Sequence, residues 1–437
     1  MKLKKLIGLM AIAGFALPGA AMATNGYFSH GYGMKAKGMG GAATAMSDDA
    51  FGGANNPASM VFAGDRLDLG VDLFSPKREM SRTGASAVPG SVASDSNYFA
   101  VPEFGYNKML NTDLSLGVSV YGNGGMNTDY PGGQFNCTPV GGSPTGNALC
   151  GVGSLGVDLM QLMIAPTVAF KIAPNHSIGI SPLIGYQRFR AEGLQAFKQI
   201  STNPNNLTNN GYDDSFGYGV RVGYMGKITP TITIGAAYAT KMNMQKFDKY
   251  KGLFAEQGAF DIPENYSLGI AWQATPALTL ALDYQRINYS GVKSISNPST
   301  QSGCVPAPPG GPGVGAGCLG GSNGIGFGWQ DVDVWKLGAA YQYNKQWTLR
   351  AGYNHGDNPI QARDVTFNIL APGVVKDHAT LGVTYLTDAG NELTVSYMHA
   401  FENSVSGKPN TVYFPVGGTD TIKMYQNSIG VAYAWKM

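Results

Sequence analysis

Charged residues and long apolar runs are scarce in this 437-residue sequence. Asp, Glu, Lys and Arg together make up 13% of the chain, which is about half of their usual share in a soluble domain. Beyond the leader described below, no uninterrupted apolar run reaches the ~18 residues that a membrane-spanning helix requires. A chain of this kind can cross a membrane only as a closed β-barrel, because lipid offers no hydrogen bonds to unpaired backbone groups.

Cysteine and histidine are scarce as well. The four cysteines form two pairs that are close in sequence, Cys137 with Cys150 and Cys304 with Cys318. In an exported protein this spacing favours two local disulfides, each stabilising by roughly 3 kcal/mol. Metal binding is the competing interpretation, but no Cys or His cluster supports it, so we expect no metal and no cofactor. The five histidines are scattered and lack the partners that a catalytic nucleophile needs, which argues against an enzyme.

The first 23 residues have the pattern of a secretory signal peptide. Lys2, Lys4 and Lys5 form the positive end, an apolar stretch runs from Leu6 to Leu17, and Ala21-Met-Ala23 is a small-x-small cleavage site. An amphipathic first helix of the mature protein is the alternative. Cleavage would remove three of the 30 basic residues and none of the 28 acidic ones, which leaves a net charge of −1. This balance argues against nucleic acid as a partner.

Two regions follow the leader. Residues 24–63 are rich in Gly, Ala, Ser and Asn and show neither strand alternation nor a long amphipathic stripe, so we expect a plug. Residues 64–437 contain about ten-residue segments in which apolar and polar residues alternate, the repeated signal of an outer-membrane barrel. A soluble sandwich can show the same alternation within a strand. The connections favour the barrel, because short turns and long loops alternate strictly.

We predict an all-β fold, a 14-stranded antiparallel transmembrane β-barrel. The strands are expected near residues 65–75, 97–107, 113–121, 159–171, 177–190, 215–227, 231–241, 265–274, 277–289, 332–343, 347–354, 376–386, 391–400 and 426–436. Fourteen is an even number, as closure of a bacterial barrel requires.

Residue parity separates the two faces of the wall. Both signs of charge are expected in the lumen, on Asp68, Asp72, Glu103, Arg221, Asp283, Lys336 and Arg350. Aromatic residues at strand ends would form two interfacial girdles, among them Tyr98, Tyr218, Tyr289, Trp335, Tyr353 and Trp435.

Two long loops keep apolar residues that a solvated loop would not ordinarily retain. The first carries Leu194, Phe197 and Ile200. The second carries Met244, Phe247, Tyr250, Leu253 and Phe254 at spacings of three and four, which favours an amphipathic surface helix. Such patches point to a ligand site, although the two segments could simply pack on each other and cap the barrel. The stretch 291–330, rich in Pro and Gly, is expected to be a flexible loop without a core of its own.

At three places the sequence resembles the FadL family of outer-membrane transporters for long-chain fatty acids and other hydrophobic compounds. The first is Gly38-Met-Gly-Gly-Ala-Ala-Thr-Ala45 followed by Asn56-Pro57-Ala58, the second is Ser119 to Tyr130, and the third is Ser396-Tyr-Met-His399. The resemblance implies an N-terminal hatch inside the barrel. It also implies an outer hydrophobic groove between Gly193–Asp214 and Lys241–Asp261, and a tighter internal pocket. One departure is Met437, which replaces the family's C-terminal aromatic residue.

The resemblance also implies roles for individual residues. The gate would comprise Asn55, Asn56, Pro57 and Ala58 in the hatch, together with a kink in the third strand at Gly122, Gly124 and Gly125 that lets ligand leave sideways into the membrane. An ordinary turn into a loop is the alternative for those glycines. Arg188, Arg190 and Arg363 are the nearest matches for groups that meet a fatty acid carboxylate. The alternative is that these arginines hold lipopolysaccharide phosphates or loop carbonyls.

These observations predict a passive channel in the outer membrane of a Gram-negative bacterium, expected as a monomer among outer-membrane lipid and lipopolysaccharide. Long-chain fatty acid is the first choice of ligand, and aromatic or alkane hydrocarbons are the second. The rivals are an outer-membrane enzyme and an open general porin, and the porin would conduct small solutes where a plugged barrel would not.

Overall fold

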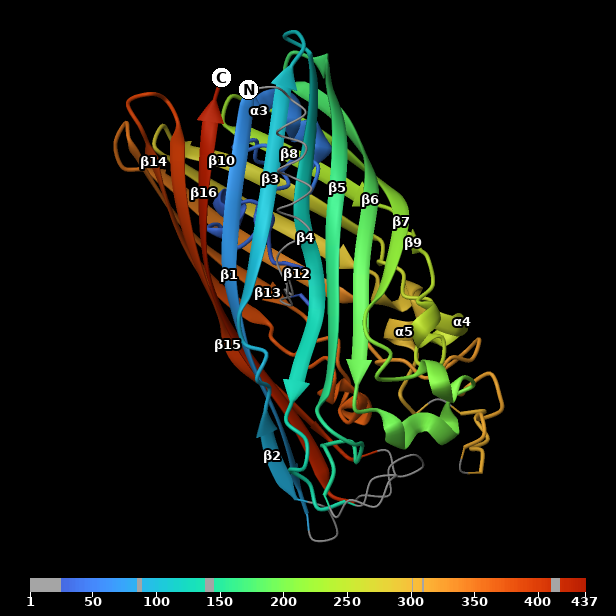
Figure 1. Cartoon of the computed structure of the whole chain (residues 1–437). Coiled ribbons are helices and arrows are strands. Elements are labelled where there is room, and N and C mark those ends of the chain that lie inside the picture. The colour runs from blue at the N-terminus through green and yellow to red at the C-terminus, as the bar shows by residue number, and fades with distance from the viewer. Residues whose placement is uncertain (1–24, 85–88, 138–144, 301, 309, 410–416) are drawn as a thin grey trace.

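A computed structural model describes residues 25–437 except 85–88, 138–144, 301, 309 and 410–416. Within these residues, fourteen long strands form one antiparallel sheet that closes into a barrel (Figure 1). Closure is made by the first strand, β1 (Arg66–Thr83), and the last, β16 (Thr419–Lys436), which pair from Arg66 opposite Lys436 to Thr83 opposite Thr419. The predicted barrel is therefore confirmed.

Between these two, neighbouring strands in the sheet follow one another along the chain. They are β3 (Phe99–Met109), β4 (Leu114–Tyr130), β5 (Leu155–Ala173), β6 (His176–Glu192), β7 (Asp213–Lys227), β8 (Ile232–Ala239), β10 (Asn265–Thr275), β11 (Leu278–Ile287), β12 (Val332–Gln342), β13 (Trp347–Gly356), β14 (Asp377–Leu386) and β15 (Glu392–Gly407). Two short strands, β2 (Gly90–Ala93) and β9 (Asn243–Met244), pair with β1 and β7 at the rim.

The described helices are all short. The α-helices are α2 (Met34–Lys37), α3 (Met60–Ala63), α4 (Ala255–Gly258) and α5 (Lys293–Ser296). The 3-10 helices are η1 (Pro57–Ser59), η2 (Gln195–Ile200), η3 (Pro204–Asn206), η4 (Asp248–Tyr250), η5 (Tyr289–Gly291), η6 (Ala362–Asp364) and η7 (Phe367–Ile369). Among the described residues, no helix has the length and apolar character needed to span a membrane.

Short turns lie at the end of the barrel that holds both β1's start and β16's end, and long loops lie at the other end (Figure 1). The predicted alternation is thus present. Several strands run farther toward the long loops than predicted: β1 continues to Thr83, β4 to Tyr130 and β15 to Gly407. These extensions are rich in polar residues, so hydrophobic alternation does not reveal them.

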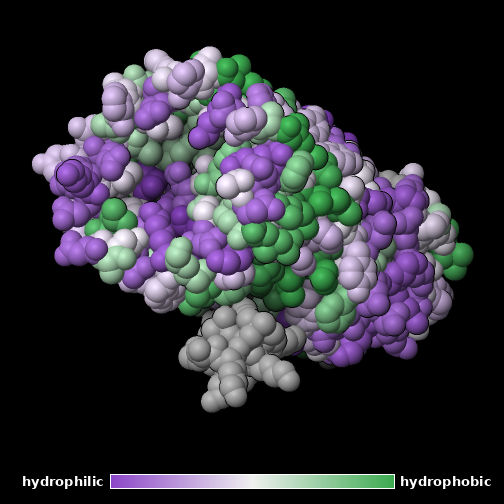
Figure 2. Space-filling view, turned by 90° about the horizontal axis from the view of Figure 1, so that it is seen from above, coloured by the Kyte–Doolittle hydropathy of each residue, from purple (hydrophilic) through white to green (hydrophobic). Residues whose placement is uncertain are grey.

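The outer face of the wall is apolar. On β1, Leu69, Val71 and Leu73 are exposed, whereas Asp68 and Asp72 on the opposite face are buried. Figure 2 shows hydrophobic side chains gathered in a belt between two hydrophilic regions. Most aromatic residues predicted for the girdles are indeed exposed, including Tyr98, Tyr218, Trp335, Tyr353 and Trp435.

The girdle prediction is wrong for Tyr289. This side chain is fully buried in η5, where its hydroxyl donates to the carbonyl of Asn25 at 2.6 Å. Tyr289 lies beyond the end of β11, so strand parity no longer fixes its direction, and the chain turns it toward the interior.

The lumen contains residues 25–65, named here the N-terminal segment (Figure 1). This segment includes the short helices α2, η1 and α3. Small residues allow very close contact with the wall. The Cα of Gly38 lies against the backbone of Gly382 on β14, and Gly40 lies against the backbone of Tyr353 on β13. Larger side chains at these positions would displace the segment.

Candidate functional site: the filled lumen and its loop cap

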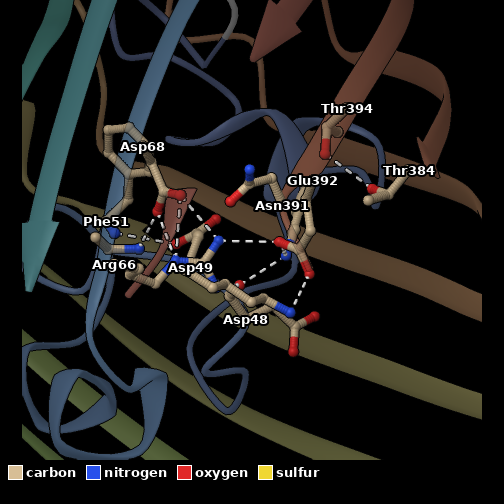
Figure 3. Close-up of polar contacts among 12 residues, drawn as sticks. Asp48, Asp49, Phe51, Arg66, Asp68, Thr384, Asn391, Glu392 and Thr394 are labelled. Carbon is tan, nitrogen blue, oxygen red and sulfur yellow. Dashed lines mark hydrogen bonds and ion pairs between the residues drawn. The ribbon is translucent and has the colours of Figure 1, made fainter. Parts of the chain in front are cut away.

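Ion pairs fasten the N-terminal segment to the wall at the short-turn end (Figure 3). The Glu392 carboxylate receives the Lys35 ammonium at 2.7 Å and the Arg66 guanidinium at 3.1 Å. Arg66 also donates to Asp68 and to the backbone carbonyl of Asp48. The cluster joins the segment to the first and the penultimate strands, so it helps to hold the barrel closure and the segment together.

Further charges pair deeper in the lumen. Lys37 lies 2.8 Å from Asp72 and 3.8 Å from Glu103. The carboxylate of Asp283 accepts hydrogen bonds from the backbone N–H groups of Ala43 and Thr44, both at 2.8 Å. The seven charged residues predicted for the lumen are all buried. Their signs are mixed, whereas an ion-selective pore carries a ring of one sign.

The Asn-Pro-Ala stretch is tied to the wall through Asn56. Its amide donates to the carbonyls of Thr44 at 2.7 Å and Tyr224 at 2.9 Å, and its side-chain oxygen accepts from the N–H of Ala58 at 3.1 Å. Pro57 and Ala58 lie against the backbone of β6, where Gly179 leaves room for them. Asn55 is half-buried, and within the described residues its side chain makes one hydrogen bond, donated to the carbonyl of Tyr32 at 2.9 Å. Asn56 is thus the stronger anchor of the two.

The third barrel strand, β4, separates from β3 partway along its length. It pairs with β3 only as far as Val120 opposite Phe104, and its register with β5 shifts between Gly122 and Gly124. Beyond this bulge β4 is bonded on its free edge by the N-terminal segment: Ser29 donates to the carbonyl of Asn123 at 3.2 Å, and Gly125 donates to that of Tyr27 at 3.2 Å. The segment therefore takes the place of a neighbouring strand at the glycines singled out in the sequence.

The two apolar loops fold over the long-loop end of the barrel. All eight side chains predicted to hold ligand there are buried: Leu194, Phe197, Ile200, Met244, Phe247, Tyr250, Leu253 and Phe254. The amphipathic helix predicted over the second loop is wrong. Met242 pairs with Ile262, and the N–H of Phe247 donates to the carbonyl of Gly258 at 2.9 Å. The loop folds back on itself, and these cross-loop bonds replace the helical ones.

Aromatic rings run in contact from these loops to the N-terminal segment. Phe189 at the end of β6 contacts Phe254 with ring centroids 4.7 Å apart, and Phe254 contacts Phe260 at 4.8 Å. Phe260 in turn lies 6.3 Å from Tyr27. Tyr27 is the residue bonded to β4 beside the bulge. An apolar path thus connects the outer loops to the break in the wall, and in this structure side chains fill it.

The stretch 291–330 is part of this core, contrary to the prediction. Ile295, Leu319, Phe327 and Trp329 are all buried, and Trp329 lies 6.1 Å from Tyr27 between ring centroids. The prediction was wrong because it rested on the many glycines and prolines of this stretch, whereas its few large apolar residues anchor it in the core. Two disulfides fasten the cap: Cys304–Cys318 has a Cα–Cα distance of 4.6 Å, and Cys137–Cys150 has one of 5.7 Å.

The three arginines suggested by the resemblance lie away from this core. Arg188 and Arg190 continue the outward series of β6 begun by the exposed Ile178 and Ile180. Their guanidinium carbons lie 3.9 and 5.0 Å from the ring centroid of Tyr212. Arg363 is exposed in η6 and pairs with Asp364 at 3.0 Å. The structure does not bring these three together.

Arg78 on β1 is a buried arginine that no sequence motif marks. It is 5% exposed, donates to the carbonyl of Asn127, and lies 5.8 Å from the ring centroid of Phe99. Within the described residues its Nε and Nη2 have no partner, and neither does the nearby hydroxyl of Tyr130. The residues outside the description include no Asp or Glu. Parity extended from Asp68 and Asp72 along β1 would have placed Arg78 in the lumen.

Two small cavities lie in the lumen. One lies within the N-terminal segment and the other lies between this segment and the wall, and each measures about 20 Å³, enough for about one water molecule. One is lined by the buried cations Arg221 and Lys336. The described structure is thus closed to anything larger than water at these places.

Comparison with known proteins gives a consistent result. A family model described as "Outer membrane protein transport protein (OMPP1/FadL/TodX)" matches residues 9–434. No curated protein matches the sequence.

Solved structures similar to this chain share its fold. The Pseudomonas putida toluene transporter TodX has a TM-score of 0.68 and 18% identity, covering 95% of this chain and 100% of that one. A Pseudomonas aeruginosa FadL homologue has a TM-score of 0.69 and 17% identity, covering 94% and 99%. The Ralstonia pickettii toluene transporter TbuX has a TM-score of 0.64 and 17% identity, covering 93% and 99%.

Proposed function

Because the chain belongs to the family of outer membrane transport proteins that includes FadL and TodX, we propose that it carries hydrophobic small molecules passively across the outer membrane. The observation that carries this proposal is the line of contacting rings from Phe189 to Tyr27, which ends where β4 leaves its neighbour. A ligand would enter among the loop side chains, displace them, and shift Tyr27 from the edge of β4. Burial supplies the affinity, at roughly 0.8 kcal/mol per methylene.

Long-chain fatty acid is our first candidate ligand. Arg78 is a buried cation without a carboxylate partner, set among Phe99 and Tyr130. A buried unpaired charge is costly, and a ligand carboxylate would relieve that cost. The unbonded edge of Arg78 is covered in this structure, so neighbouring side chains have to move before a carboxylate can reach it.

Aromatic hydrocarbon is the second candidate. The similar proteins TodX and TbuX are toluene transporters by description, and the ring-lined path suits a flat apolar solute. Such a ligand would make no use of Arg78. Both candidates share the same route and differ in the polar contact alone.

Uptake into liposomes tests the proposal. The purified full-length protein is reconstituted, and entry of labelled oleate and of labelled toluene is followed against protein-free liposomes. Faster entry of oleate supports the first candidate, and faster entry of toluene alone supports the second. Acceleration of neither compound contradicts the channel.

A further inference from the structure

A groove of about 230 Å³ lies on the outside of the wall at the long-loop ends of β4, β5 and β6. Three polar residues meet across it in register, Asn127 on β4, Asp158 on β5 and Arg190 on β6. Three aromatic residues, Tyr98, Phe99 and Tyr212, line it as well. Asp158 and Arg190 belong to the outward series of their strands, so the groove opens on the outside of the wall. At its inner edge Phe99 and Asn127 also adjoin Arg78.

Two residues that line this groove each have a covered side-chain oxygen atom that receives no donor from the part of the chain that the structure describes. Asp158 is 6% exposed: its Oδ2 accepts from the Tyr212 hydroxyl at 2.6 Å, and its Oδ1 has no partner within the described residues. Asn127 is 9% exposed, and its Oδ1 likewise has no partner among the residues that the structure describes. Unsatisfied buried acceptors are costly. A ligand that brings hydroxyl or amide donors would satisfy both oxygen atoms once neighbouring side chains move, because both atoms are covered in this structure.

Rings and cations flank the same groove. Tyr98 is 68% exposed, and the Lys77 ammonium lies 4.7 Å from its ring centroid. The guanidinium groups of Arg188 and Arg190 lie over the ring of Tyr212. An apolar ring face packs against the C–H face of a sugar, acceptors bind its hydroxyl rim, and arginine and lysine bind phosphate. Glu192 and Asp214 beside the arginines keep the local charge mixed.

The height of the groove on the wall identifies the source of such a ligand. From the groove toward the short-turn end, the wall next presents the exposed aromatic residues Phe216 and Tyr218 on β7. The exposed Ile178 and Ile180 on β6 lie farther in the same direction. Aromatic residues mark the interface between the hydrocarbon and the headgroups. The groove therefore lies at headgroup level on the side of the long loops, which in outer-membrane barrels is the extracellular side.

We propose that this groove binds the phosphorylated amino-sugar headgroup of an outer-leaflet glycolipid, whose acyl chains lie along the apolar wall below. Asp158 and Asn127 accept hydrogen bonds from the sugar, Tyr98 packs against it, and Arg190 and Lys77 face its phosphates. This site holds a lipid in place around the barrel.

Native mass spectrometry of the detergent-solubilised full-length protein tests the site, with diphosphoryl lipid A as the probe. Asp158→Ala and Tyr98→Ala should each weaken lipid A binding about tenfold, the effect of one lost hydrogen bond or ring contact. The matched control is Asp377→Ala, because Asp377 accepts from Tyr353 at the same 2.6 Å on another part of the wall. Phosphatidylethanolamine, which lacks the sugar, should not distinguish the variants.

Two outcomes overturn the proposal: equal lipid A binding by wild type and both groove variants, or an equal loss in the Asp377→Ala control. Displacement of lipid A by oleate would also overturn it, because the groove would then belong to the transported ligand. Oleate and toluene uptake should be unchanged in Tyr98→Ala. The lipid-binding proposal can therefore be wrong while the transport proposal holds, and the transport proposal can be wrong while the lipid-binding proposal holds.

Discussion

A Cβ atom on Gly124 would lie 1.7 Å from the carbonyl oxygen of Tyr27. The contact is backbone to backbone, so no side-chain rotation can relieve it. Gly124→Ala should therefore push Tyr27 off the edge of β4 and open the break in the wall. We expect increased small-solute conductance in planar bilayers, where the wild-type protein stays closed.

Gly291→Ala is the control for this change, because a Cβ there meets nothing within 4 Å. It should leave conductance at the wild-type level. A silent Gly124→Ala channel that still folds would show that Tyr27 does not seal the break.

Arg78 provides the test that separates the two ligand classes. Arg78→Gln keeps a polar side chain, although a shorter one, and removes the charge, so oleate binding should weaken about tenfold to a hundredfold, as expected for a charge-assisted hydrogen bond. Toluene binding should not change, since toluene has no anionic group. Equilibrium binding of both compounds to the purified variant measures the difference.

Arg363→Gln is the matched control, because Arg363 is exposed and already paired with Asp364. It should bind oleate as the wild type does. If Arg78→Gln loses both compounds equally, Arg78 supports the fold and does not select the ligand.

Asn56 and Asn55 are neighbours with unequal attachment. Asn56→Ala removes three hydrogen bonds in a fully buried position, whereas Asn55→Ala removes one in a half-buried position. Leaving buried partners unsatisfied costs about 1–3 kcal/mol per group. Limited proteolysis should cut the N-terminal segment much faster in Asn56→Ala than in Asn55→Ala, with the barrel intact in both. Equal cleavage would contradict an anchoring role for Asn56.

The barrel could be predicted because its wall obeys one physical rule. Each strand faces lipid on one side and a polar lumen on the other, so Leu69 and Asp68 alternate in a way that period and parity reveal. The N-terminal segment could be suspected from its small residues, since close backbone contact such as that of Gly40 with Tyr353 requires them.

The loop cap and the polar sites could not be predicted in the same way. Met244 to Phe254 has helical spacing, but its conformation depends on contacts with Ile262 and Phe189, which come from other parts of the chain. Tyr289 lies just past a strand, where parity ends. Arg78 is a candidate ligand contact because it is buried without a carboxylate partner, and the spacing of residues in the sequence does not show which groups surround a side chain in space.

We expect His30 to make the attachment of the N-terminal segment sensitive to pH. Its ring is fully buried and stacks on that of His378 with centroids 6.1 Å apart. Burial lowers the pKa of His30 well below its usual value, and the nearby His378, Lys37 and Lys336 lower it further. The attached state therefore holds His30 neutral, whereas a released segment would take up a proton near pH 6.5. Attachment is fully stable above that pH and weakens as the pH falls below it.

Conductance in planar bilayers should accordingly rise when the pH is lowered from about 7.5 to about 5, the range in which an exposed histidine gains its charge. His30→Gln cannot take up that proton, so its conductance should depend much less on pH over the same range. His399→Gln, on the half-buried ring bonded to Asn427 in the wall, should respond to pH as the wild type does. An unchanged pH response in His30→Gln would mean that another group releases the segment.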